Sequence, residues 1–143
     1  MKRIREINEN KKKTILIVDD ESIIRQSSIK CIENYFKSKN ISSEISFLEA
    51  SDGIEALYCI YWSIVNNVYI DYIFTDDSLK IMNGYELIKI VQEFLDKSRI
   101  YKIDSFVVSA YQVSETQIKY PYKCVKHIFT KPLNKTMLNE INL

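Results

Sequence analysis

Residues 14–20 of the chain read TILIVDD, a short apolar run that ends in two acidic residues. A continuous run rich in β-branched residues is typical of a strand buried on both faces, as in a parallel sheet. Further strands are predicted over 44–48, 69–75, 105–108 and 125–129, and helices over 22–39, 54–65, 85–95 and 133–143. Strands that alternate with helices predict an α/β fold, in which helices cover both faces of one parallel sheet.

The composition fits a single soluble domain inside the cell. The chain has 143 residues, and its 20 basic and 19 acidic residues leave a net charge of +1, so nothing favours nucleic acid or a membrane surface as a partner. It has no apolar stretch of about 18 residues, and its three cysteines show no CxxC spacing, which indicates reduced thiols and a cytoplasmic location. We expect a tail or linker over 1–12 and one domain over 13–143.

The predicted strands end in residues that suit metal and phosphate chemistry. These residues are Asp19, Asp20, Asp76, Asp77, Ser109 and Lys131. Ligands of open α/β sheets bind beyond the carboxyl ends of the strands, where these groups would meet. Clustered carboxylates call for a cation such as Mg²⁺, and a lysine ammonium suits a phosphate. Each residue alone has a simpler explanation as a helix cap or a solvated turn, but the combination indicates a site for a metal and a phosphoryl group.

Five sequence blocks carry a resemblance to a known family. The blocks are ILIVDDE at 15–21, EASDGIEAL at 49–57, DYIFTD at 71–76 with MNGYEL at 82–87, VVSA at 107–110 and FTKPL at 129–133. In this order they resemble the receiver domains of response regulators in two-component signalling. The resemblance implies a doubly wound, flavodoxin-like sheet of five parallel strands in the order 2-1-3-4-5. The family's phosphoacceptor lies eight residues before a loop glycine, and 84 − 8 = 76 selects Asp76 over Asp77.

The resemblance also implies a magnesium-dependent phosphoacceptor. Asp76 would take a phosphoryl group from a phosphohistidine and form an acyl phosphate. Mg²⁺ would be held by Asp20, by Asp76 and by the main-chain carbonyl of Ser78, with Asp19 acting through a water molecule.

Further residues would assist the phosphoryl transfer and change conformation in response to it. Lys131 would neutralise the phosphoryl oxygens, Ser109 would donate a hydrogen bond to them, and the bond from Lys131 to Pro132 would be cis. Ile128 stands where receivers commonly carry a switch aromatic, which puts the usual rotamer switch in question. We also hypothesise that Tyr111 covers the phosphoryl group and prolongs the phosphorylated state.

The aromatic residues of the second predicted helix have a plain interpretation. Tyr58, Tyr61 and Trp62 lie at near-helical spacing. This spacing favours packing of the helix within the fold over a cofactor site.

Three functions compete. The first is a phosphorylated switch rather than a conventional enzyme, with a histidine kinase or a histidine phosphotransfer protein as its partner and an unknown effector. The second is a receiver-fold interaction module that works without phosphorylation. The third, a metal-dependent phosphohydrolase, is disfavoured because such enzymes carry a D-x-D pattern after the first strand. This chain has two adjacent acids there, Asp19 and Asp20. The receiver could stand alone or come from a hybrid histidine kinase, and a dimer is left open.

Overall fold

A single five-stranded sheet organises the chain. The computed structural model describes residues 12–39, 44–97, 102–110, 120–141 and 143. Its strands are β1 (Lys12–Val18), β2 (Glu44–Ala50), β3 (Tyr72–Asp76), β4 (Asp104–Ser109) and β5 (Val125–Thr130), and its helices are α2 (Ser22–Ser38), α3 (Gly53–Val65), α4 (Gly84–Lys97) and α6 (Lys135–Ile141). All neighbouring strands pair in parallel, in the order β2-β1-β3-β4-β5. The predicted α/β class and strand order are confirmed.

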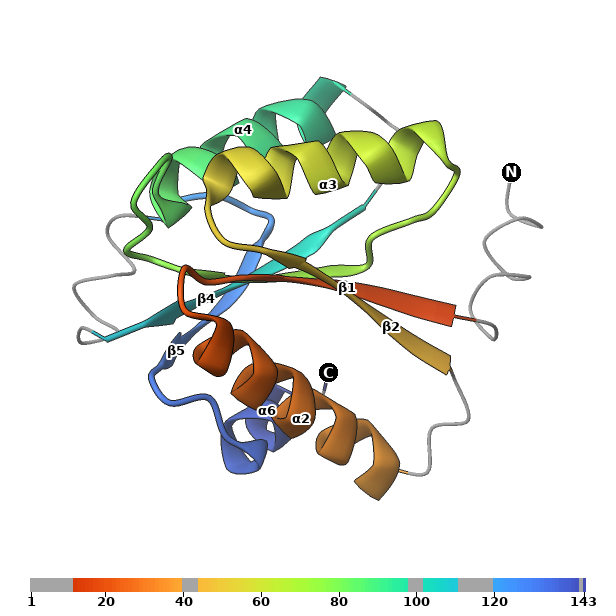
Figure 1. Ribbon diagram of the computed structural model, residues 1–143, viewed down its shortest axis with the longest axis vertical. Helices are drawn as coiled ribbons and strands as arrows, with labels where there is room; N and C mark the ends of the chain where they lie inside the picture. The colour runs from red at the N-terminus through yellow and green to blue at the C-terminus, as the bar shows by residue number, and fades with distance from the viewer. Residues whose placement is uncertain (1–11, 40–43, 98–101, 111–119, 142) are drawn as a thin grey trace.

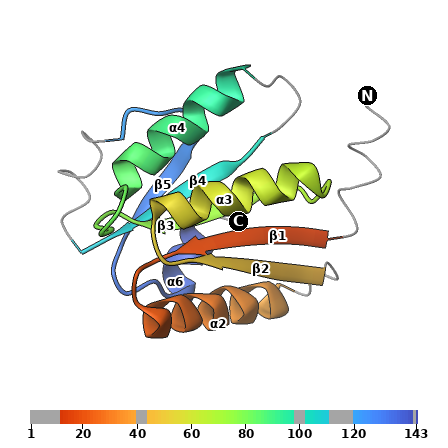
Figure 2. The ribbon, with the colours of Figure 1, turned by 45° about the horizontal axis from the view of Figure 1, so that its top comes forward.

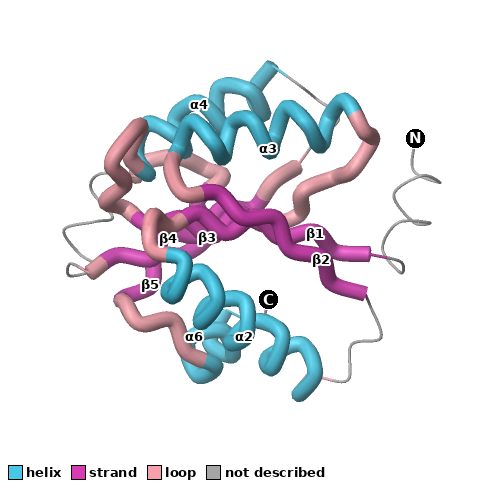
Figure 3. The backbone as a smooth tube through the Cα atoms, in the orientation of Figure 1, coloured by secondary structure: helices cyan, strands magenta, loops and turns pink. Residues whose placement is uncertain are grey.

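The sheet lies between two helical layers. Helices α3 and α4 cover one face, and α2 and α6 cover the other (Figures 1 and 3). Successive side chains of a strand point to opposite faces, so Ile15 and Ile17 enter the core beneath α2 and α6, whereas Leu16 and Val18 enter the core beneath α3 and α4. The strand is therefore apolar at each position from Ile15 to Val18, which is the pattern that identified it.

Several element boundaries differ from the predicted ones. Strand β1 begins at Lys12, one residue before the predicted start of the domain. The prediction of a strand from residue 69 is wrong, because β3 begins at Tyr72. Before it, Asp71 exchanges hydrogen bonds with Thr14 through its main-chain N–H and its carboxylate, both 2.9 Å long. Residues 1–11 of the predicted tail, and Tyr111 with its proposed role, lie outside the described residues.

The predicted packing of the α3 aromatics within the fold is wrong for Tyr58 and Tyr61. Their side chains are 67% and 66% exposed, and Trp62 is partly exposed as well. Helix α3 instead turns a side of small residues toward the sheet, with Ala56 fully buried. Among the helices within the described ranges, none is long and apolar enough to cross a membrane.

Gly84 packs against the end of β3. Its N–H donates to the carbonyl oxygen of Asp77 at 3.1 Å. A Cβ atom added at Gly84 would lie 2.3 Å from the carbonyl oxygen of Asp76. Backbone therefore meets backbone at the start of α4, and a residue without a side chain is required there.

We expect Gly84→Ala to destabilise the fold by about 1–3 kcal/mol, because the backbone around Asp76 has to shift to admit the methyl group. Chemical denaturation followed by circular dichroism measures this. Lys89→Ala, on the exposed side of the same helix, is the control and should change stability by less than about 0.5 kcal/mol. Equal stability of the two variants would contradict the close approach.

Candidate functional site

The carboxyl ends of four strands meet at one edge of the sheet. Asp19 directly follows β1, Asp76 ends β3, Ser109 ends β4 and Lys131 directly follows β5. Main-chain hydrogen bonds hold two of these positions: the Asp19 N–H donates to the Ala50 carbonyl at 3.1 Å, and the Lys131 N–H donates to the Ser109 carbonyl at 2.8 Å. Parallel pairing thus extends one residue beyond β1 and β5, which fixes the backbone beneath the charged side chains.

One ammonium group is shared by two buried carboxylates. Lys131 Nζ lies 3.0 Å from Asp76 Oδ2 and 3.1 Å from Asp19 Oδ2. Asp19 is 3% exposed and Asp76 is 7% exposed, whereas Lys131 retains partial contact with solvent. These three residues were predicted at the strand ends, and the structure brings them together.

Sharing one cation leaves the carboxylates incompletely neutralised. Burial raises the pKa of Asp76, and repulsion from Asp19 adds to this, although Lys131 and the Ser78 N–H act in the opposite direction. Burial alone would lower the pKa of Lys131, but its hydrogen bonds to Asp76 and Asp19 raise it overall. The lysine therefore stays charged, and its single positive charge faces two buried carboxyl groups.

Two further acids, Asp20 and Glu21, lie close to Asp19 at this edge. Carboxylate oxygens of Asp19, Asp20 and Glu21 lie within 4.8 Å of one another. The side chain of Asp19 accepts a hydrogen bond from the Glu21 N–H at 2.9 Å, and its carbonyl accepts one from Arg25 at 2.7 Å. An all-oxygen donor set with excess negative charge fits a hard divalent cation. The sequence places Glu21 among these acids but assigns it no role.

Ser78 is a further predicted residue with a hydrogen bond to Asp76. The Oδ1 atom of Asp76 accepts this bond from the Ser78 N–H at 3.2 Å, which orients the carboxylate. Ser109 is fully buried, and Ile128 is buried on β5, where it pairs with Val107 of β4. The peptide bond from Lys131 to Pro132 is cis.

Tyr120, which was not predicted from the sequence, also contacts the carboxyl edge of the sheet. The hydroxyl of Tyr120 donates a hydrogen bond to Asp77 Oδ1, and both residues are buried. This burial, followed by the bond to Asp77, raises the pKa of Tyr120 well above its usual range. The Tyr120 ring meets that of Tyr85 edge-on, at a centroid distance of 6.0 Å. Tyr120 thereby ties the loop before β5 to the residue after Asp76 and to helix α4.

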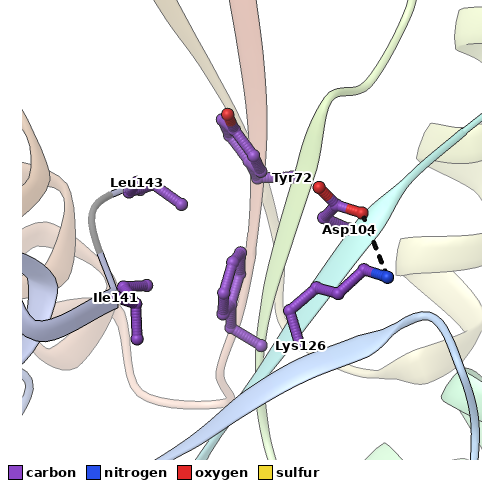
Figure 4. Close-up of a pocket in the computed structure, with 6 residues that line it drawn as sticks. Tyr72, Asp104, Lys126, Ile141 and Leu143 are labelled. Atoms are coloured by element: carbon purple, nitrogen blue, oxygen red, sulfur yellow. Dashed lines mark ion pairs between the residues drawn. The ribbon is translucent and has the colours of Figure 1, made fainter.

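A separate cavity of about 350 Å³ lies at the opposite edge of the sheet (Figure 4). Its walls are Tyr72, Asp104, Phe106, Lys126, Ile141 and Leu143. Tyr72 and Asp104 are the first residues of β3 and β4, so this cavity faces the amino ends of the strands. It is distinct from the candidate site.

Several solved structures share the fold of this chain. The chain is similar to a two component response regulator from Cytophaga hutchinsonii (TM-score 0.73, 20% identity, covering 91% of this chain and 93% of that one). It is also similar to the signal receiver domain of an HD domain-containing protein from Pseudomonas fluorescens (TM-score 0.67, 15% identity, covering 92% of this chain and 91% of that one). A third match is a co-crystal structure of a Saccharomyces cerevisiae histidine phosphotransfer signaling protein with the receiver domain of its downstream response regulator (TM-score 0.66, 21% identity, 90% and 85% covered). No family model and no curated protein matches the sequence.

The chain has the receiver fold. At these identities the likeness establishes the architecture, whereas the chemistry of the site depends on the side chains of this chain. In this receiver fold, Asp19, Asp76 and Lys131 gather at the carboxyl edge of the sheet, where α/β proteins bind their ligands.

The raised pKa of Asp76 predicts a stability effect. An acid whose pKa is higher in the folded state gives stability that is present below the unfolded pKa and is lost as the pH rises through the folded pKa. At pH 7, without divalent cations, Asp76→Asn should therefore melt at a higher temperature than the wild type, and the difference should shrink in acid. Glu33→Gln removes the same charge at an exposed position and should leave the melting temperature unchanged. A lower melting temperature for Asp76→Asn at pH 7 would contradict this assignment.

Removing the Tyr120 hydroxyl tests the other buried contact. Tyr120→Phe deprives Asp77 of this donor, so we expect a loss of about 1–3 kcal/mol in the free energy of unfolding. Tyr58→Phe removes an exposed hydroxyl and serves as the matched control, with an expected change of less than about 0.5 kcal/mol. Urea denaturation measures both, and equal losses would show that the Tyr120 bond contributes nothing specific.

Proposed function

We propose that the chain is a phosphorylated signalling switch in which Asp76 accepts a phosphoryl group in a Mg²⁺-dependent reaction. The observation that carries the proposal is the shared ion pair: Asp76 and Asp19 are both buried and divide one ammonium between them. Such an edge has spare negative charge for a metal ion and a fixed positive charge for a phosphoryl group. The receiver fold supports the same conclusion by analogy.

In the proposed transfer, a carboxylate oxygen of Asp76 forms a bond to phosphorus. The phosphorus–nitrogen bond of a phosphohistidine breaks at the same time, and the imidazole leaves with the electron pair of that bond. The Ser78 N–H at 3.2 Å and Lys131 at 3.0 Å hold the two Asp76 oxygens, so the carboxylate is oriented before the donor arrives. Positioning and charge stabilisation account for most of the catalysis in such a step.

The metal would be held by residues of the same edge. We assign Asp20, Asp76 and the main-chain carbonyl of Ser78 as direct ligands, with Asp19 acting through water. When bound, Mg²⁺ offsets the negative charge that gathers on the phosphoryl oxygens. The excess of carboxylates over lysine at this edge is the feature of this chain that fits such a cation.

Lys131 and Ser109 would respond to the new group. Lys131 would bind a phosphoryl oxygen, and Ser109 would donate a hydrogen bond to it and draw its loop inward. Because the Lys131 N–H already donates to the Ser109 carbonyl, the two strand ends would move together. Ile128 is the residue at the switch position, and its branched side chain cannot reproduce the rotation of an aromatic ring.

The partners follow from the chemistry of the donor. We propose a histidine kinase or a histidine phosphotransfer protein as the phosphodonor. A similar structure holds a histidine phosphotransfer protein bound to a receiver domain. The receiver domain over 13–143, the tail or linker over 1–12, a cytoplasmic location and an origin in a hybrid kinase are parts of the same proposal. A phosphorylation-independent interaction module is the alternative, and Ile128 is the residue that favours it.

The deciding experiment is incorporation of phosphate from a small phosphodonor, or of beryllofluoride as its mimic, with and without Mg²⁺. We expect one group per chain in the presence of Mg²⁺, and none in Asp76→Asn. Asp77→Asn is the matched control, because it alters the adjacent acid and should still take up one group. Intact-mass spectrometry reads out the phosphorylated forms.

The other outcomes point to other functions. An unmodified wild type would support the interaction module. Release of many phosphates per chain from a simple ester would indicate a phosphohydrolase. Modification of Asp76→Asn but not of Asp77→Asn would move the acceptor to the neighbouring residue.

A further inference from the structure

Helix α3 exposes an unusual amount of apolar surface. Nine large hydrophobic side chains are exposed within the described ranges. Six of them belong to this helix: Ile54, Tyr58, Tyr61, Trp62, Ile64 and Val65. Scattered exposed hydrophobic residues need no explanation, but their concentration on a single helix marks an interaction site.

Four of these residues form a continuous stripe. Ile54, Tyr58, Tyr61 and Val65 follow one another at intervals of four, three and four residues, which places them on one side of the helix. Helix α3 lies against one face of the sheet (Figures 1 and 2). Its buried residue Ala56 is on the side of the helix opposite to this stripe. We call the exposed stripe the outer α3 face. Its 4-3-4 spacing is the pattern by which one helix packs on another.

The outer α3 face carries almost no charge. Glu55 is the single charged residue of the helix, and its carboxylate accepts a hydrogen bond from Ser51 at 2.5 Å. Depletion of charge together with exposed tyrosine and tryptophan is the composition of a protein interface core. A face of this kind does not fit nucleic acid or lipid headgroups, both of which would require basic residues.

We infer that the outer α3 face binds the same face of a second copy of this chain, with the two helices antiparallel. An antiparallel pair places Glu55 beside the last turn of the other helix, which carries no acidic residue, whereas a parallel pair would bring two copies of Glu55 together. The antiparallel arrangement also opposes the two helix dipoles favourably. Tyr58 of one copy then faces Tyr61 of the other.

The available area supports a reversible dimer. An aromatic side chain offers about 150–250 Å², so the exposed parts of the outer α3 face and Trp62 amount to roughly 500 Å². This is near the upper end of the patches of about 300–600 Å² found on monomers, and it is more than half of the about 800 Å² that each partner buries in a standard interface. Apolar groups between α3 and α4, such as Leu57 and Phe94, can enlarge the contact.

Sedimentation velocity of the full chain from about 1 µM to about 1 mM tests the dimer, since interfaces smaller than the standard size form weak, transient complexes. We expect the average mass to rise toward twice that of the monomer. Tyr58→Glu and Tyr61→Lys should each weaken association about tenfold or more. Ile23→Glu places a charge on a still more exposed hydrophobic residue, on α2, and is the control that should leave association unchanged.

A mixture of the two variants tests the antiparallel arrangement. Equal amounts of Tyr58→Glu and Tyr61→Lys should form a mixed dimer, because the introduced charges face each other and the second contact keeps both native tyrosines. A wild type that stays monomeric throughout, or a dimer insensitive to both variants, would overturn the interface. A wild-type dimer without recovery in the mixture would overturn the antiparallel geometry.

Discussion

The ammonium of Lys131, shared between Asp19 and Asp76, is the interaction on which the carboxyl edge of the sheet depends. The two carboxylates come from the adjacent strands β1 and β3, and the lysine reaches them from β5, past β4. The ion pairs therefore require the observed strand order and its register. One positive charge thus serves two buried acids, and the adjacent Asp20 and Glu21 add to the excess of acidic over basic groups at this edge.

The ends of the strands were predictable from the sequence because the residue type changes abruptly there. Buried parallel strands are apolar, so the change to acids after Val18 and Thr75 located the ends of β1 and β3 to within one residue. The end of β5, predicted at residue 129, lies one residue later, at Thr130. Boundaries set by side-chain hydrogen bonds were less accurate: Asp71 pairs with Thr14 outside the regular ladder, and this delays the start of β3.

Two features lay beyond what the sequence could show, for different reasons. The bond between Tyr120 and Asp77 joins residues 43 positions apart and leaves no periodic trace in the chain. Helix α3 presents the opposite difficulty, because it is apolar on two sides and periodicity alone cannot say which side meets the sheet. Small residues at 53, 56 and 63 give the answer in retrospect, since they let the helix approach the strands closely.

The charge imbalance also explains how a small covalent change could alter the fold. A phosphoryl group brings nearly two negative charges to an edge that one lysine already fails to neutralise. Lys131 would then divide its hydrogen bonds differently among Asp19, Asp76 and the new oxygens, and its main-chain bond to Ser109 would transmit that change to β4. Tyr120 anchors the neighbouring carboxylate of Asp77 on the other side. In the proposed switch, the phosphoryl group would favour one arrangement of these shared bonds over another and so shift the population between them.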